Sequence, residues 1–300
     1  MWMRAIVAVV IAGSAAAAWA APPLATVTIL DGASVALLRD TGRYALAEGV
    51  RLQKDDILVL GPQVHLVRIE FANGVIADLG PDTQLLLAPK LAGNRSKFSP
   101  TAYLMQGWVK LTSPASPTSE PSASLASLPL DIPSVARQAV VSVSPDEAGT
   151  FAEAGLVTLV ERIGGHPMPP LLLKGDQFFS RLGAAKSTVS ARPPSAFVSR
   201  VPRPFTDTLP SRVAMFANRD VTPKRLGDLS YADAQPWIDA EPALRPAALA
   251  RWRGQVKVPE FRSSLAANMK AHPEWDRLVF PQKYLPRPSV DAQTAASVPR

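Results

Sequence analysis

Short apolar runs alternate with turn residues throughout residues 24–111. A turn signal interrupts the runs roughly every ten residues, which is a spacing typical of all-β proteins. Asn73-Gly74 is the strongest of these signals, because a tight hairpin turn requires positive φ at both central positions. Gly80-Pro81 closes the next run. The pattern predicts a mainly β fold, with the short strands in a solenoid-like or β-roll stack.

Individual strands can be placed from their apolar residues. Residues 64–71 alternate in part, and the charges at Arg68 and Glu70 predict a strand with one face in water. A strand pair is predicted around Gly107, and a Ser/Pro-rich insertion at 112–129 has the composition of a linker. Strands are predicted at 24–30, 35–38, 57–60, 64–71, 75–79, 84–87, 139–143, 156–160 and 171–173, with a closing element at 175–179.

The pattern changes toward helix in the last third of the chain. Residues 184–210 are rich in Pro and Arg and are predicted to form a linker. Within 211–285, Ser230 and Asp233 match a capping box, in which each side chain accepts a hydrogen bond from the backbone of the other. The sequence therefore predicts a small, mainly helical region here, followed by a disordered tail at 286–300.

The N-terminus has the composition of a secretory signal peptide. Arg4 supplies a positive charge, residues 5–18 are uncharged and mostly apolar, and Ala18-Trp19-Ala20 fits the small-x-small cleavage pattern. We expect cleavage after Ala20, a periplasmic or secreted location, and no transmembrane segment after signal removal. The alternative is an uncleaved membrane anchor, for which the apolar run is short.

Composition narrows the class of protein. The chain has 300 residues, of which 47% are apolar, so a large core and two domains are expected. The absence of cysteine excludes disulfides and thiolate chemistry. The formal net charge is +7, and the basic excess falls within residues 186–300. A basic surface could attract anionic envelope polymers or lipid head groups, although a solvated surface is the simpler explanation. Nucleic acid is not expected as a partner outside the cytoplasm.

Few residues suit catalysis or metal binding. His65, His166 and His272 have no partners at metal-ligand spacing, so neither a metal nor another cofactor is predicted. Asp55 and Asp56 are adjacent, and paired acids can share a proton during hydrolysis. Neighbouring strand residues point to opposite faces, however, which favours a turn-forming role. We therefore expect no enzymatic activity, with a glycan hydrolase as the alternative.

Aromatic and basic residues are interspersed in the C-terminal region. The candidate ligand-binding residues are Trp237, Trp252, Trp275, Arg251 and Arg253, which could present aromatic rings and charge to a sugar or an envelope polymer. The alternative is that the rings form the core of a small helical unit, because large aromatic side chains supply much of the burial that such a unit can find.

The motifs of the first half resemble one known family. Turn glycines and strand residues carry the likeness, and they occur at Gly32, Val35, Gly49-x5-Asp55-Asp56-Ile57, Phe71-Ala-Asn-Gly74, Leu79-Gly-Pro-Asp-Thr83 and Leu104–Leu111. Together they resemble the FecR-type periplasmic domain, named for the iron-dicitrate sensor family, over residues 24–183. The resemblance implies a solenoid-like β fold that contacts other proteins. Two departures are Asp55-Asp56, where the family usually has Gly-Asp, and the Ser/Pro-rich insertion.

Sensor members of that family carry a cytoplasmic segment that restrains a sigma factor. Here only four residues precede the apolar run, so we expect a stand-alone relative without that role. The sequence thus predicts an exported, non-enzymatic protein that binds or scaffolds an envelope protein through its β domain. The alternative is binding of peptidoglycan or polysaccharide through the basic, Trp-containing C-terminal region.

Overall fold

The computed structural model describes residues 23–114 and 122–285. The fold is mainly β, with 39% strand and 22% helix, which confirms the prediction from the apolar pattern. The predicted signal peptide at 1–20, the middle of the Ser/Pro-rich insertion and the predicted tail at 286–300 lie outside the described residues.

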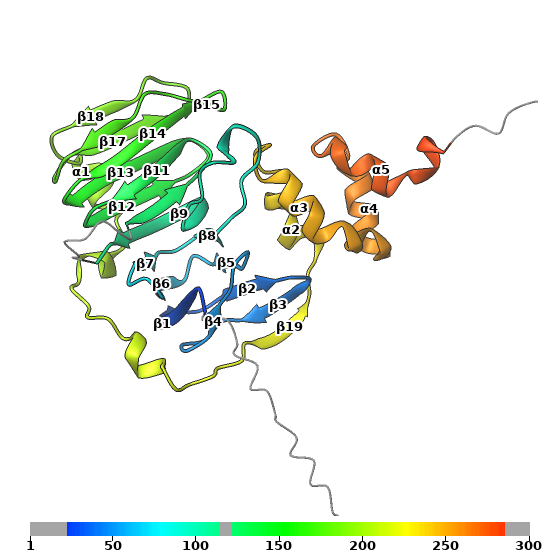
Figure 1. Cartoon of the computed structure of the whole chain (residues 1–300), viewed down its shortest axis with the longest axis horizontal. Coiled ribbons are helices and arrows are strands. Elements are labelled where there is room, and N and C mark those ends of the chain that lie inside the picture. The colour runs from blue at the N-terminus through cyan, green and yellow to red at the C-terminus, as the bar shows by residue number, and fades with distance from the viewer. Residues whose placement is uncertain (1–22, 115–121, 286–300) are drawn as a thin grey trace, which may run out of the picture.

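Two curled layers of strands, here called sheet A and sheet B, form the β region (Figure 1). Sheet A contains, in spatial order, β4 (Arg51–Leu52), β1 (Ala25–Gly32), β6 (Val64–Phe71), β7 (Ile76–Leu79), β9 (Ala102–Thr112), β12 (Gln138–Val143), β13 (Glu147–Ala154), β17 (Phe178–Leu182) and β18 (Thr188–Ser190). Sheet B contains β19 (Lys224–Asp228), β3 (Gly42–Ala45), β2 (Val35–Arg39), β5 (Ile57–Leu60), β8 (Gln84–Leu87), β9, β10 (Ala123–Ala126), β11 (Leu130–Val135), β14 (Val157–Ile163) and β16 (Leu171–Leu173), and β15 (His166–Pro167) pairs with the end of β14.

The pairings between these strands are antiparallel except for that of β9 with β10. They do not show the solenoid-like stack that the sequence suggested. The strand β10 falls inside the stretch predicted to be a Ser/Pro-rich insertion, and its Leu125 is fully buried. The sequence also did not predict β11, β13, β18 or β19, whose apolar residues are sparse or mixed with charges.

The strand β9 belongs to both sheets, because it bends at Gly107. Its first half pairs with β8 and its second half with β7 and β12. Gly107 has a φ of 101°, and a Cβ atom there would lie 2.4 Å from the Cα of Thr83. Only glycine tolerates both conditions without strain. The prediction of a strand pair around Gly107 was therefore wrong: the glycine turns one continuous strand from one sheet into the other.

The main core lies between the two sheets. It is built from inward-facing residues of nearly every strand, with Val27, Leu58, Leu104, Val141 and Leu159 as fully buried examples. Because alternate residues of a strand face opposite sides, each sheet also presents an outer face, and the two outer faces carry different residues.

An extended segment covers the outer face of sheet A. Residues 191–223, here called the strap, run from β18 to β19 and include α1 (Ser195–Val198), η2 (Arg203–Thr206) and η3 (Val213–Phe216) (Figure 1). Phe197 and Phe205 of the strap pack on Leu66, Val140 and Phe178 of the sheet. Much of the predicted linker at 184–210 is thus packed against the β region.

Charged residues of sheet A lie beneath the strap. Arg68 pairs with Asp78 through two hydrogen bonds of 2.6 and 2.8 Å, and it also donates to the carbonyl of Leu209. Glu70 accepts hydrogen bonds from strap residues and is 3% exposed. Arg68 and Glu70 do alternate out of the core, but the prediction that they face water was wrong because the strap covers them.

Short helices cover the outer face of sheet B. Trp237, Trp252 and Leu265 pack with Ile57 and Tyr103 of the sheet in a second core. The predicted capping box is present at the start of α2, where Asp233 N donates to Ser230 Oγ over 3.1 Å. The helices are α2 (Tyr231–Ile238), α3 (Arg245–Trp252), η4 (Arg253–Lys257), α4 (Pro259–Ala267), η5 (Pro273–Trp275), α5 (Asp276–Val279) and η6 (Pro281–Tyr284), and η1 (Gly93–Arg95) lies between β8 and β9. No helix in the described part of the chain is long and apolar enough to cross a bilayer.

Candidate functional site

The five candidate ligand-binding residues do not form one exposed aromatic surface. Trp237, Trp252 and Trp275 are each 2% exposed or less and belong to the core between sheet B and the helices. Arg251 is half-buried, whereas Arg253 is exposed. Trp237, Trp252 and Arg251 border the same cleft, while Trp275 and Arg253 do not line it.

Side chains at the end of α3 attach this helix to sheet B. Trp252 Nε1 donates to the carbonyl of Asp40 over 2.9 Å. Arg251 donates to the carbonyls of Leu38 and Asp55, and its guanidinium lies 5.2 Å from the centre of the Trp252 ring. Burial lowers the pKa of Arg251, although the nearby carboxylates of Asp55 and Asp40 oppose this effect. Arg251 therefore holds the helix through backbone carbonyls.

A cleft of about 460 Å³ lies between α3 and the ends of β2, β4, β5 and β8. This volume falls within the range of roughly 300–1,000 Å³ that is usual for small-molecule sites. The apolar residues that line it are Ile57, Leu86, Trp237, Leu244, Ala247, Ala248, Ala250 and Trp252. Charged side chains stand around the apolar wall, namely Arg39, Asp40, Lys54, Asp55, Asp56, Lys90 and Arg251.

The two adjacent carboxylates have separate environments. Asp56 is buried, and it accepts hydrogen bonds from Arg39 at 2.6 and 2.9 Å and from the backbone N–H of Gln53 at 2.8 Å. Asp55 has a φ of 65° in the turn between β4 and β5 and stands at the cleft. Partial burial raises its pKa, and the positive charge of Lys54 opposes the increase. This geometry agrees with a turn-forming role, and the carboxylate of Asp56 is bound by Arg39 and by the backbone of Gln53.

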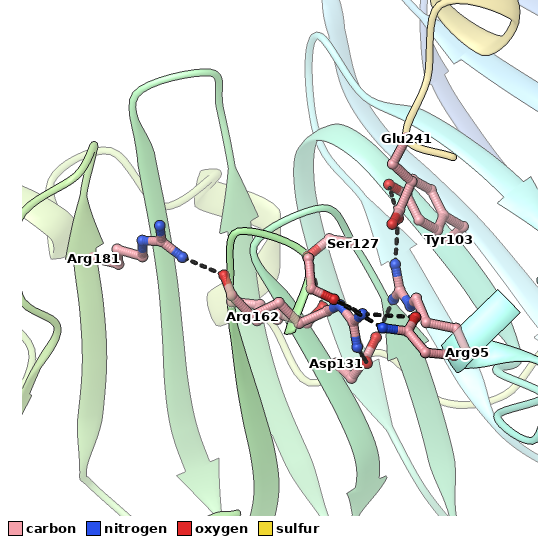
Figure 2. Close-up of polar contacts among 10 residues, drawn as sticks. Arg95, Tyr103, Ser127, Asp131, Arg162, Arg181 and Glu241 are labelled. Carbon is pink, nitrogen blue, oxygen red and sulfur yellow. Dashed lines mark hydrogen bonds and ion pairs between the residues drawn. The ribbon is translucent and has the colours of Figure 1, made fainter. Parts of the chain in front are cut away.

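A buried ionic network joins the β region to the helices (Figure 2). Arg95 pairs with Asp131 of β11 and with Glu241 of the loop between α2 and α3. Glu241 also accepts a hydrogen bond of 2.8 Å from the hydroxyl of Tyr103. Arg162 of β14 donates to the second oxygen of Asp131 over 3.2 Å. Two guanidinium groups thus face two carboxylates.

Burial dominates the electrostatics of this network. It raises the pKa of Asp131, although Arg95 and Arg162 act in the opposite direction. It also raises the pKa of Tyr103 well above its usual value, and the charge of Glu241 adds to that effect. Removing one partner from a buried ionic pair leaves an uncompensated charge, at a cost of about 3–5 kcal/mol. The network therefore has the character of a structural connection between the two parts of the chain.

Sequence reasoning missed this network. Its partners are 36 and 146 positions apart, so no local spacing joins them. The available signal was Asp131, a lone charge in the apolar run Leu130-Asp131-Ile132, because a buried charge requires a partner.

The histidines are spread over the described structure and do not form a metal site. His65 and His166 are exposed, whereas His272 is fully buried between Asp239 and the carbonyl of Leu265. The described residues contain no group of three or more His, Cys, Asp or Glu placed to hold a metal ion.

Comparisons with known proteins give little further information. No protein-family model matches the chain, and no curated protein matches it. Two crystal structures described as a "putative anti-sigma factor" from Parabacteroides distasonis are similar to it, each with 10% sequence identity and a TM-score of 0.34. Each match covers 45% of this chain and 58% of that protein. A likeness of this size carries no argument about function.

Proposed function

We propose that this chain is an exported, non-enzymatic envelope protein that binds a protein partner along the free strand edge β18. The observation that carries the proposal is that β18 is paired on one side only, with β17, among the described strands. An unpaired edge presents N–H and C=O groups to which another extended chain can add as a further strand. Export rests on the signal-like residues 1–20.

Exposed apolar side chains surround this edge. Val189 of β18 and Leu182 of β17 are 48% and 61% exposed. Val189 is paired in register with Phe179, whose side chain is in the main core, so Val189 faces the same side of the sheet as the core. The core is therefore incompletely covered at this end, and a strand added to β18 would bury its apolar residues.

Charge indicates the kind of segment that would bind. Lys186 and Arg192 lie on either side of β18, both are exposed, and neither forms an ion pair within the described residues. We therefore assign the partner as a protein with an extended, acidic segment. Opposite charge along an interface speeds association and selects among partners.

Two observations favour a protein partner over the alternatives. The carboxylate of Asp56 is bound by Arg39, which argues against Asp55 and Asp56 acting as a hydrolytic pair. Trp252 and Trp275 are buried, so neither offers an exposed indole face on which a polymer chain could stack.

Site-specific photocrosslinking tests the proposal. A photoreactive amino acid at position 189 should give one discrete crosslinked protein in cells of the source bacterium. The double variant Lys186→Glu/Arg192→Glu should lower its yield at least tenfold, while Lys270→Glu, at an exposed site on the helical side, should not change it. The partner should then bind the purified chain through an acidic segment.

Equal crosslinking in the charge-reversed and control variants would contradict the proposal, as would crosslinks only to abundant unrelated proteins. Export is checked separately by fractionating the cells and sequencing the N-terminus of the mature protein, which should begin at Ala21.

A further inference from the structure

The cleft between α3 and sheet B has a mainly apolar wall. Trp237, which is 2% exposed, and Trp252 both line the cleft. The other apolar residues of the wall are aliphatic, so the cleft suits an apolar chain.

The charges around the cleft favour an anionic head group. Arg39 is neutralised by Asp56 at 2.6 Å. Lys54 and Lys90 form no ion pair within the described residues, and the hydrogen bonds of the Arg251 guanidinium within those residues go to carbonyl oxygens. Asp40 and Asp55 are the opposing carboxylates. Three cations thus face two anions, and the two lysines are exposed and free to turn toward a ligand.

We propose that this cleft binds an amphiphilic anion, with its apolar chain against Trp237, Leu86 and Ala247 and its head group near Lys54 and Lys90. The head group is a carboxylate or a phosphate, which share the negative charge that the lysines recognise. This inference goes beyond the proposed function, because the cleft is bordered by α3. The helix α3 and the strand β18 lie at different sides of the molecule (Figure 1).

Isothermal titration calorimetry with dodecanoate, below its micellar concentration, tests the proposal on the purified chain. Dodecanoate should bind with one site per chain, and dodecyltrimethylammonium, which has the same tail and a cationic head, should bind at least tenfold more weakly. A parallel titration with dodecyl phosphate distinguishes the two head groups. The probe with the higher affinity shows whether the cleft prefers a carboxylate or a phosphate head group.

Matched variants locate the binding site. Lys54→Glu/Lys90→Glu should weaken dodecanoate binding at least tenfold, while Lys270→Glu should leave it unchanged. Asp55→Asn should strengthen binding a few-fold, because it removes a nearby negative charge and asparagine tolerates the positive φ at this position. Ala247→Phe should block the apolar part of the cleft and abolish binding.

Equal affinity for the cationic probe, or unchanged binding in Ala247→Phe with an unchanged Tm, would overturn the proposal. Binding of a soluble muropeptide to this cleft in place of dodecanoate would overturn it as well. Crosslinking at position 189 should be unaffected by Ala247→Phe, so failure of this inference and failure of the proposed function can be distinguished.

Discussion

The outer faces of sheets A and B are covered in different ways. On sheet A, an extended strap is held by two phenylalanines and by buried charges, among them Arg68 and Glu70. On sheet B, short helices are held mainly by apolar contacts around Trp237 and Trp252. One cover follows the sheet as a ribbon, while the other forms a second core.

The difference follows from the residues that each sheet directs outward. Carbonyls and N–H groups of an extended chain are free to bond with side chains, so a charged sheet face can bind a strap through its backbone. The outer face of sheet B is mainly apolar, so large apolar side chains that helices present on one side cover most of it. Hydrogen bonds and ion pairs of Glu241 and Arg251 add to this contact. The kind of residue on the outer face of a strand therefore indicates the kind of structure that can cover it.

Among the variants that test this comparison, Trp252→Ala should cause the largest loss of stability. It removes a fully buried ring and its hydrogen bond to Asp40, so the free energy of unfolding should fall by about 3–5 kcal/mol. Chemical denaturation measures the change, and limited proteolysis should cut first within the helices. Cleavage that begins in the strap would show that the two covers are not independent.

Glu70→Gln weakens the attachment of the strap and should lower the free energy of unfolding by about 1–3 kcal/mol at pH 7. Burial alone would raise the pKa of Glu70, but hydrogen bonds from Ser211, Arg212 N–H and Thr28 outweigh it and lower the pKa below the ordinary 4.5. The ionised carboxylate therefore stabilises the folded state fully above pH 4.5. This contribution is lost as the pH falls through the lowered pKa of the folded state.

Denaturation at several values between pH 7 and pH 3 tests this prediction. The difference between the wild type and Glu70→Gln should narrow as the solution becomes acidic. Glu260→Gln, at an exposed position on α4, serves as the control, and its difference from the wild type should be smaller than that of Glu70→Gln at pH 7. A difference that stays constant with pH would exclude the ionised carboxylate as the cause.

Alanine substitutions of Arg251 and Arg253 should lower the free energy of unfolding by different amounts. Arg251→Ala removes hydrogen bonds to two backbone carbonyls and should cost about 1–3 kcal/mol. Arg253 is exposed, so Arg253→Ala should change the free energy of unfolding by no more than about 0.5 kcal/mol. Similar losses in thermal denaturation for both variants would contradict the attachment of α3 to sheet B.

Local patterns were sufficient where neighbours in sequence decide the structure. Residues 64–71 and 84–87 form strands with the predicted bounds, and Ser230 caps α2 as expected. Gly107 was recognised as a break, but its close contact with Thr83 depends on a strand elsewhere in the chain. Whether it separates two strands or bends one could not be decided from its neighbours.

The candidate site was predictable only in part, for the same reason. The C-terminal tryptophans were identified with two possible roles, and their burial depends on how the helices lie on sheet B. The sequence does not distinguish Lys54 and Lys90 from other exposed lysines, because only the fold brings them to the cleft. The burial of Glu70 likewise depends on Ser211, which is 141 positions away.

The pairing of β19 with β3 has a consequence for how the molecule can be assembled. Lys224 pairs with Ala45, so β19 covers the edge of the β2–β3 hairpin although it lies about 180 residues later in the sequence. That early edge stays open during folding until the final third of the chain has joined the sheet. Such distant closure slows folding and leaves the incomplete sheet vulnerable to pairing with neighbouring molecules.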